Sequence, residues 1–204
     1  MLLKKTIRAS EQDREDIQRK RSEWKTFQNE FPAQHLIFID ETGVKTSMTR
    51  LYGRAQKNSR CYDSAPDGRW ERLTLLSAIN FEGQTESVVF EGATDRKMFE
   101  EYIEKILAPT LKADTIVIMD NLNVHKSEKS REIIERTGAR LVYLPAYSPD
   151  LNPIEKMWSK VKQILRGLKA RTCEELDRGI KIALNSVSKT DAQGWYKSCG
   201  YVNS

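Results

Sequence analysis

The stretch LIFID at residues 36–40 joins four apolar residues to an aspartate, and IVIMD at residues 116–120 repeats that arrangement. Short apolar runs with β-branched residues, bounded by polar residues, are typical of strands buried in a sheet. Asp40 and Asp120 are therefore predicted to stand at the ends of two core strands. A polar residue at the surface end of a strand is common, so this position alone assigns no role to either aspartate.

The segments around these two runs predict an α/β fold. Further strands are expected at residues 73–80, 86–91 and 140–144, and helices at about 95–107, 128–137, 153–168 and 173–188. This order predicts a mixed five-stranded sheet flanked by helices. Residues 10–29 predict one more helix, which is highly charged and has few apolar residues. That pattern is typical of a linker or partner-binding helix rather than a core helix.

The composition limits the class of protein. At 204 residues with 39% hydrophobic content, the chain can bury one sizeable core. No apolar run reaches the roughly 20 residues that span a bilayer, and the N-terminus lacks the apolar stretch of a signal peptide. A cytoplasmic protein without a membrane partner is expected. The three cysteines are widely spaced and predict neither a disulfide framework nor a zinc site.

Glu155 supplies a third acid near the start of the predicted 153–168 helix. If Asn152 is the N-cap, Glu155 is the third helical residue, where a glutamate can close a capping box. That structural reading explains Glu155 without a catalytic role. The helix face favours a functional reading, because a polar row runs along the edge of the apolar stripe. The row consists of Glu155, Ser159, Lys162 and Arg166.

The positive charge of the chain is concentrated on the same helix. The formal net charge is +5, and residues 153–171 hold six lysines and arginines against Glu155 alone. A basic stripe of this kind is typical of a surface that binds nucleic acid. Lys162 and Arg166, which share the row of Glu155, are therefore predicted to position DNA phosphates.

Three carboxylates at one site would suit divalent metal ions. Mg²⁺ prefers oxygen ligands, and two such ions can clamp the attacking and leaving oxygens of a displacement at phosphorus. Without a cation, two carboxylates about 4 Å apart repel each other by roughly 4 kcal/mol at an effective dielectric near 20. Asp150 and Glu41 are rival ligands. Asp150 is expected to begin a turn, and Glu41 to point away from Asp40 to the other face of the strand.

Two other segments contain candidate DNA contacts. His125 and Lys126 follow Asp120 in the loop before the next predicted helix. Arg54 and Trp70 belong to a polar segment, residues 44–72, which is expected to be irregular or to form a short hairpin. Aromatic side chains beside cations suit stacking on unpaired bases. For both segments a solvated surface loop is the alternative.

Three motifs together resemble a known family. They are FIDETG at residues 38–43, MDNLNVHK at 119–126 and YSPDLNPIE at 147–155, followed by Trp158. This set resembles the DDE transposases of the mariner superfamily, specifically the bacterial insertion-sequence branch. The 34 residues between Asp120 and Glu155 match the spacing of that branch. The resemblance implies an RNase H-like fold, with Asp40, Asp120 and Glu155 as catalytic acids and as ligands of two Mg²⁺ or Mn²⁺ ions.

The resemblance also implies an activity. In this family water cleaves DNA at the transposon ends, and the freed 3′-OH then attacks target DNA, typically at a TA dinucleotide. Two alternatives remain open. One is an RNase H-like nuclease or resolvase without strand transfer, and the other is a catalytically inactive remnant that binds DNA.

The expected domains and partners follow from the same resemblance. Residues 1–34 are expected to form a charged helical lead-in, and residues 35–204 the catalytic domain. Family members typically carry helix-turn-helix units before this domain, whereas about 35 residues here leave room for one helix. The chain is therefore expected to be a catalytic half that binds DNA as a homodimer at the bacterial nucleoid. A separate N-terminal helix-turn-helix half is a candidate partner.

Overall fold

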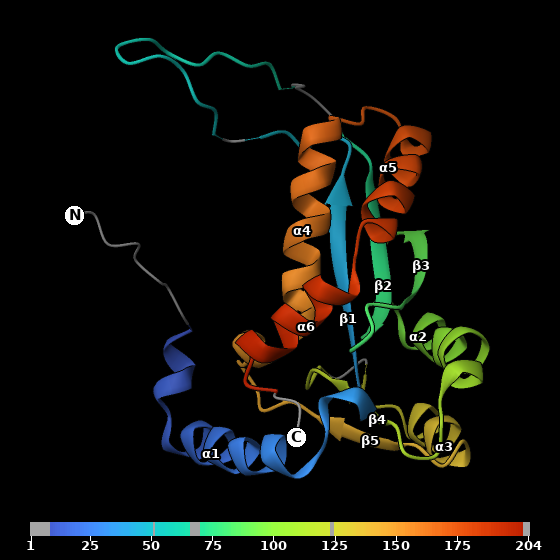
Figure 1. Cartoon of the computed structure of the whole chain (residues 1–204). Coiled ribbons are helices and arrows are strands. Elements are labelled where there is room, and N and C mark those ends of the chain that lie inside the picture. Colours follow the sequence, from blue (N-terminus) through green and yellow to red (C-terminus); the bar gives the residue numbers. More distant parts are fainter. Residues whose placement is uncertain (1–8, 51, 66–69, 123–124, 202–204) are drawn as a thin grey trace.

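The computed structural model describes residues 9–50, 52–65, 70–122 and 125–201. A single mixed sheet lies at the centre of the fold. The strand order is β3-β2-β1-β4-β5 (Figure 1). The strands are β1 (Leu36–Lys45), β2 (Arg72–Asn80), β3 (Thr85–Glu91), β4 (Ile116–Met119) and β5 (Arg140–Tyr143). The β1–β2 and β2–β3 pairs are antiparallel, and the β1–β4 and β4–β5 pairs are parallel. The mixed five-stranded sheet predicted from the sequence is confirmed.

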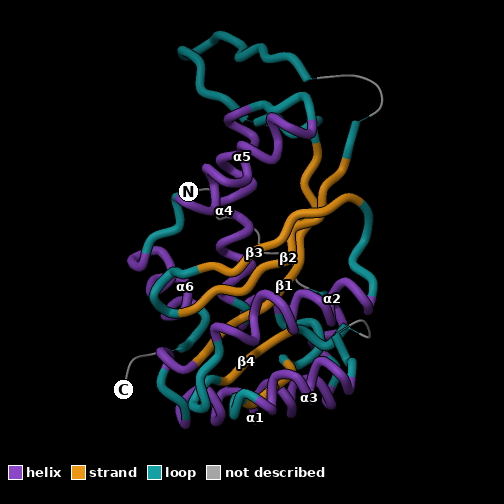
Figure 2. Tube along the Cα trace, turned by 90° about the vertical axis from the view of Figure 1, so that its right-hand side faces the viewer, coloured by secondary structure: helices purple, strands orange, loops and turns teal. Residues whose placement is uncertain are grey.

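Helices flank this sheet (Figure 2). They are α1 (Glu15–Glu30), α2 (Arg96–Tyr102), α3 (Glu128–Arg136), α4 (Pro153–Leu168), α5 (Cys173–Asn185) and α6 (Lys189–Ser198), and α2 continues as a π-helical turn at Ile103–Leu107. None of the helices in the described ranges is both long and apolar enough to cross a membrane. Along β1, Phe38 packs into the core under α4, α5 and α6, whereas Ile39 packs against α2. Asp40 and Glu41 continue this alternation to opposite faces.

The helix α6 differs from the prediction, which ended the last helix at about residue 188. Ser188 and Asp191 open α6 with a capping box. Tyr196 is fully buried, and its hydroxyl donates to the backbone oxygen of Leu36 at 2.9 Å. A buried hydroxyl requires such a partner. Leu36 lies 160 residues earlier in the chain, so this contact leaves no local pattern in the sequence.

The charged helix predicted near the N-terminus is present as α1, but it packs against the rest of the fold. Trp24 is only 6% exposed, and its indole N–H donates to the hydroxyl of Tyr201 at 3.0 Å. The Gln28 amide donates to the backbone oxygen of Cys199 at 2.8 Å. The expectation that α1 contributes little to the core is therefore wrong for Trp24.

The described residues between β1 and β2 (46–50, 52–65 and 70–71) form a projecting loop beyond the C-terminal end of α4 (Figure 1). Its described residues contain no strand, in agreement with the irregular segment that was expected. Arg171 holds the base of the loop by donating to the backbone oxygens of Thr46 and Met48 at 2.9 and 3.2 Å.

Candidate metal and nucleic-acid site

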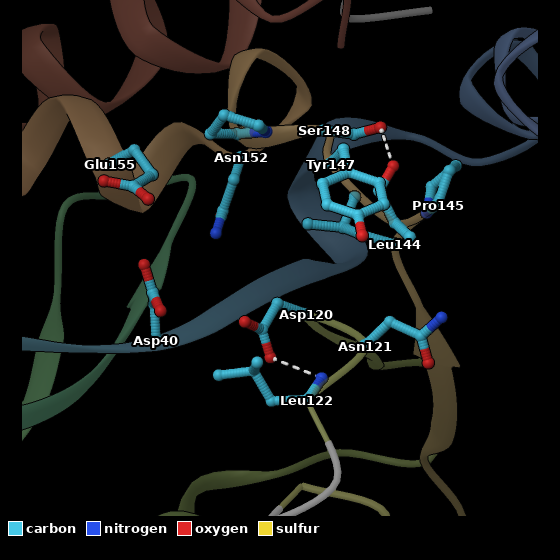
Figure 3. Close-up of a pocket in the computed structure, with 12 residues that line it drawn as sticks. Asp40, Asp120, Asn121, Leu122, Leu144, Pro145, Tyr147, Ser148, Asn152 and Glu155 are labelled. Carbon is cyan, nitrogen blue, oxygen red and sulfur yellow. Dashed lines mark hydrogen bonds between the residues drawn. The ribbon is translucent and has the colours of Figure 1, made fainter. Parts of the chain in front are cut away.

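Asp40 and Asp120 lie side by side because β1 and β4 are parallel neighbours. The expectation that Asp40 ends its strand is wrong, since β1 continues to Lys45 along β2; Asp40 lies where the pairing of β1 with β4 stops. The register pairs Ile39 with Met119, and in each segment the next residue is the aspartate. Glu155 lies in the first turn of α4, the helix that packs on β1. The three acids line one cavity of about 350 Å³ (Figure 3). The structure thus brings together the three acids that the sequence singled out.

The negative charges in this cavity oppose one another. Asp40 is 7% exposed, and its Oδ1 atom accepts the backbone N–H of Glu41 at 2.9 Å. Burial, followed by the charges of Glu155 and Asp120, raises the pKa of Asp40 well above its ordinary value. The pKa of Glu155 is also raised, mainly because burial removes water from its carboxylate. The charge of Asp120 raises this pKa further, whereas the charge of Lys162 lowers it. Positive charge in the cavity would reverse these effects.

The donor chemistry of the three acids fits a hard divalent cation. All of the donors are carboxylate oxygens, which Mg²⁺ and Mn²⁺ accept as ligands. In the described part of the chain, no three His, Cys, Asp or Glu side chains are close enough together to hold a metal ion in common. Asp40, Asp120 and Glu155 line one cavity, but they could hold an ion in common only if their side chains moved closer together.

His125 is placed differently from the predicted DNA contact. Its side chain is completely buried, and its ring stacks on Phe99 with a centroid separation of 4.5 Å. The backbone oxygen of His125 accepts the hydroxyl of Tyr143 at 3.1 Å. The side chain has no exposed surface, so the structure places it inside the fold and not at the surface where a DNA contact was expected.

Each imidazole nitrogen of His125 instead contacts a carboxylate. Nδ1 contacts Oδ1 of Asp120, and Nε2 lies 2.8 Å from Oε2 of Glu41. Ionised carboxylates only accept hydrogen bonds, so with both acids ionised the two nitrogens donate and the ring is an imidazolium. Burial alone disfavours this charge, but the bonds to Asp120 and Glu41 outweigh it and raise the pKa of His125 to about 9.

The same contacts orient Asp120. The backbone N–H of Leu122 donates to the oxygen that His125 contacts, at 3.2 Å. The other oxygen of Asp120 points toward Asp40 (Figure 3). His125 therefore holds one side of a carboxylate whose other side faces the cavity.

The two rival acids have partners outside the cavity. Glu41 binds His125 on the face opposite to Asp40, as its position in the strand predicted. Asp150 forms two hydrogen bonds with the guanidinium of Arg21, at 3.0 and 2.6 Å. Arg21 also donates to Ser148 at 2.6 Å. In this way α1 is fastened to the turn that forms one wall of the cavity.

Three of the six cations on and after α4 serve the fold. Lys160 and Lys169 form ion pairs of 2.6 Å, and Arg171 binds the base of the projecting loop. Lys162 and Arg166, by contrast, make no salt bridge within the described ranges, and both lie on the row of Glu155. Lys162 is close enough to Glu155 and Asp40 for their charges to act on it, and Arg166 lies one turn further along α4.

The projecting loop and α4 enclose a second cavity of about 820 Å³, which is basic. It is lined by Arg50, Tyr52, Gly53, Arg54, Gln163 and Arg166. This set includes two of the predicted DNA contacts, Arg54 and Arg166, and no acid. Of the other predicted contacts, Lys126 is exposed. Trp70 is 49% exposed, with the Lys45 ammonium 5.7 Å from its ring centroid.

Several residues that line the acidic cavity received no site role from the sequence, among them Leu122, Tyr147 and Asn152. Tyr147 has a left-handed backbone, with φ of 57°, which turns the chain at the cavity wall. Asn152 precedes α4 as predicted, but its side chain makes no capping bond. The available signal was the YSPDLNPIE motif, which contains Tyr147 and Asn152 together with Glu155.

Residues 35–177 match the protein family described as DDE superfamily endonuclease. The chain belongs to this family. Among DDE relatives, the Tcb1 transposase of Caenorhabditis briggsae is 29% identical over 106 residues, which cover 50% of this chain and 39% of that protein. The IS630 insertion element 39 kDa protein of Shigella sonnei is 26% identical over 164 residues, 78% of this chain and 48% of that protein. This DDE chain thus spans about half or less of these relatives.

Solved structures share the fold of this DDE chain. The pre-cleavage Mos1 transpososome matches with a TM-score of 0.73 at 11% identity, covering 98% of this chain and 66% of that chain. The catalytic domain of the Mos1 mariner transposase matches with a TM-score of 0.67 at 12% identity, covering 96% and 93%. These likenesses confirm the RNase H-like fold that was expected.

Proposed function

We propose that this chain is the catalytic part of a transposase, which cleaves DNA at transposon ends and joins the freed 3′-OH to target DNA. The observation that carries the proposal is the anionic cavity of Asp40, Asp120 and Glu155. Lys162 and Arg166 follow Glu155 along α4 and form no salt bridge with any described residue. Three carboxylates suit metal ions, and adjacent cations suit a polyanionic substrate. Similarity to the Tcb1 transposase supports the same activity.

Asp40, Asp120 and Glu155 are proposed to be the residues that would hold two Mg²⁺ or Mn²⁺ ions. Divalent ions bound there would supply an activated water molecule and offset negative charge on the phosphate. Solved complexes of Mos1, a protein of the same fold, with Mg and with Mn support the choice of metal. The contribution of the chain itself is three carboxylates from β1, the end of β4 and the first turn of α4 that line one cavity.

The proposed reaction consists of two displacements at phosphorus. In the first, a water oxygen forms a bond to phosphorus and the bond from phosphorus to the 3′ oxygen breaks, which leaves a 3′-OH and a 5′-phosphate. In the second, this 3′-OH attacks a phosphodiester of the target, and the target 3′ oxygen leaves. One phosphodiester replaces another, so the second step requires neither an energy source nor a covalent intermediate with the protein.

Lys162 and Arg166 are proposed to hold DNA phosphates along α4, and Arg54 to extend that track into the basic cavity. Lys126 and Trp70 are proposed as further DNA contacts, supported by their exposure. His125 is proposed to position Asp120, because it holds one oxygen of that carboxylate and is itself tied to Glu41. Outer partners of this kind raise metal affinity by roughly 10–100-fold.

The proposed substrates and partners are transposon-end DNA, target DNA with a TA sequence, and a second copy of the chain. Residues 1–34 are proposed to lead from a helix-turn-helix half, on the same or a separate chain, into the catalytic domain of residues 35–204. The contacts of α1 with the cavity wall support a close connection between these parts. Binding to bacterial DNA would locate the protein at the nucleoid.

Cleavage and joining can be measured separately. With Mg²⁺ or Mn²⁺, the chain should cleave duplex DNA and should join a pre-cut oligonucleotide with a 3′-OH to a plasmid. Asp40→Asn, Asp120→Asn and Glu155→Gln should each abolish both reactions, whereas Asp177→Asn on the surface of α5 should retain both. Cleavage without joining would identify a nuclease instead. DNA binding with neither reaction would identify an inactive remnant.

A further inference from the structure

Asn152 combines deep burial with an unsatisfied side chain. Only 3% of its surface is exposed, and its Oδ1 atom has no hydrogen-bond partner among the described residues. An unpaired buried polar atom costs roughly 1–3 kcal/mol. An asparagine that precedes a helix ordinarily avoids this cost by capping the first turn, but Asn152 makes no such bond. The fold therefore keeps a costly arrangement at this position.

The side chain of Asn152 enters the acidic cavity instead of capping α4. It extends from the start of α4 into the space between Glu155 and the two aspartates, with its amide nitrogen leading (Figure 3). The carboxamide thus brings N–H donors into a cavity where the side chains of Asp40, Asp120 and Glu155 act as acceptors.

We propose that Asn152 contacts the substrate, and that its amide nitrogen donates a hydrogen bond to a non-bridging oxygen of the phosphodiester at the three carboxylates. This inference rests on the proposed function of the same cavity. A neutral carboxamide supplies a donor without displacing the cations that the carboxylates need. Negative charge on the phosphate oxygens changes as the bonds to phosphorus change, so a fixed donor can favour the transition state.

If Asn152 served only to stabilise the fold, its substitution would lower the stability of the protein. Because the Asn152 side chain forms no capping bond, Asn152→Ala removes no bond that stabilises α4 and should unfold close to the wild-type temperature. Asn152→Asp keeps the size of the side chain and removes the donor. The two variants together separate loss of the donor from loss of volume.

Single-turnover cleavage of a duplex oligonucleotide by the full chain, at saturating Mg²⁺, tests the contact. Loss of one preorganised donor of this kind lowers rates by roughly 100–1000-fold. Asn152→Ala and Asn152→Asp should both show such a loss, and the affinity of Asn152→Ala for DNA should stay close to wild type. Asn185→Ala, at the exposed end of α5, should cleave at the wild-type rate. A wild-type rate in Asn152→Ala would overturn the proposal.

Substitution of sulfur in the substrate distinguishes a direct contact from a general disturbance. A phosphorothioate at the cleaved phosphate replaces one of the two non-bridging oxygens by sulfur, which is a weak acceptor. For the diastereomer whose sulfur faces Asn152, the rate advantage of wild type over Asn152→Ala should shrink at least tenfold. An equal advantage on the oxygen substrate and on both diastereomers would indicate a structural effect and overturn the contact.

Nuclear magnetic resonance tests the contact of Asn152 with DNA independently of whether the chain cleaves DNA. The side-chain amide signal of Asn152, identified by its absence in Asn152→Ala, should shift when a short duplex and Mg²⁺ are added. A shift in a wild-type chain that cleaves no DNA would uphold the contact and reject the proposed function. Cleavage by wild type, with the Asn152 signal unmoved and that of Asn121 shifted, would reject the contact and uphold the function.

Discussion

The Oε2 atom of Glu41 lies 2.8 Å from the Nε2 atom of His125, on the opposite side of β1 from Asp40. The same imidazole contacts Asp120 at the end of β4 through its other nitrogen. Glu41 is therefore connected to the candidate metal site without lining the cavity, since consecutive residues of a strand point to opposite faces. Its charge can be removed without removing a donor from the cavity.

Glu41→Gln should raise the Mg²⁺ concentration for half-maximal DNA cleavage by roughly tenfold, with a smaller effect on the rate at saturating Mg²⁺. Glutamine keeps the size of the side chain but not its charge, so His125 loses one charged partner and orients Asp120 less firmly. Initial rates over a Mg²⁺ titration measure the change. Glu174→Gln, exposed in the first turn of α5, is the control and should keep the wild-type requirement. An unchanged Mg²⁺ requirement in Glu41→Gln would show that the contact with Asp120 is enough to hold His125 in its orientation.

Asp40→Asn should raise the free energy of unfolding of the metal-free protein by about 0.5–2 kcal/mol while abolishing cleavage. The substitution removes a charge that burial, Glu155 and Asp120 all disfavour. Denaturant titration at neutral pH measures the difference. Saturating Mg²⁺ should reverse the order, because a site held at 100 times its dissociation constant gains about 2.7 kcal/mol. A metal-free variant less stable than wild type would contradict the argument.

The sheet could be predicted because apolar runs report burial directly. The runs at residues 36–39 and 116–119 are mostly buried, and their parallel pairing places Asp40 beside Asp120. The row on α4 follows from the helical repeat, so Glu155 could be added from the sequence. Side-chain orientation at a strand end or helix start is local geometry, which periodicity describes well.

Contacts between distant segments explain what the sequence did not predict. His125 resembled a polar loop residue because its partner Glu41 lies 84 residues earlier. The helix α1 resembled an exposed linker because the contact that buries Trp24 comes from Tyr201, 177 residues later. Such contacts depend on the completed fold, and a charged or aromatic residue carries no local pattern that reveals its partner.

Lys160→Met should lower the free energy of unfolding by about 1–2 kcal/mol at neutral pH. The Lys160 ammonium lies 2.6 Å from Asp191 and 2.7 Å from the backbone oxygen of Ser186. The hydrogen bonds from Lys160 and Ser188 lower the pKa of Asp191 from 3.8 to about 2.

The pH dependence of this loss follows from the direction of that shift. A carboxyl whose pKa is lower in the folded state contributes stability above its unfolded pKa of 3.8, and this contribution disappears as the pH falls through about 2. The difference between wild type and Lys160→Met should therefore be constant from pH 5 to 7 and shrink as the pH falls below about 4. Thermal unfolding across this range measures it. A difference independent of pH would assign the whole effect to Ser186.

Arg166→Gln and Arg54→Gln should each weaken DNA binding to a similar degree on every DNA sequence. Both residues line the basic cavity between the projecting loop and α4, which contains no acid to compensate them. Each phosphate contact contributes about 0.9 to the slope of log affinity against log salt, so each variant should lower the slope by about 1. Fluorescence anisotropy at several salt concentrations measures this. Arg136→Gln on α3, where Arg136 is paired with Glu132 at 3.1 Å, should keep the wild-type slope. If Arg166→Gln also kept the wild-type slope, the DNA backbone would have to bind away from the C-terminal half of α4.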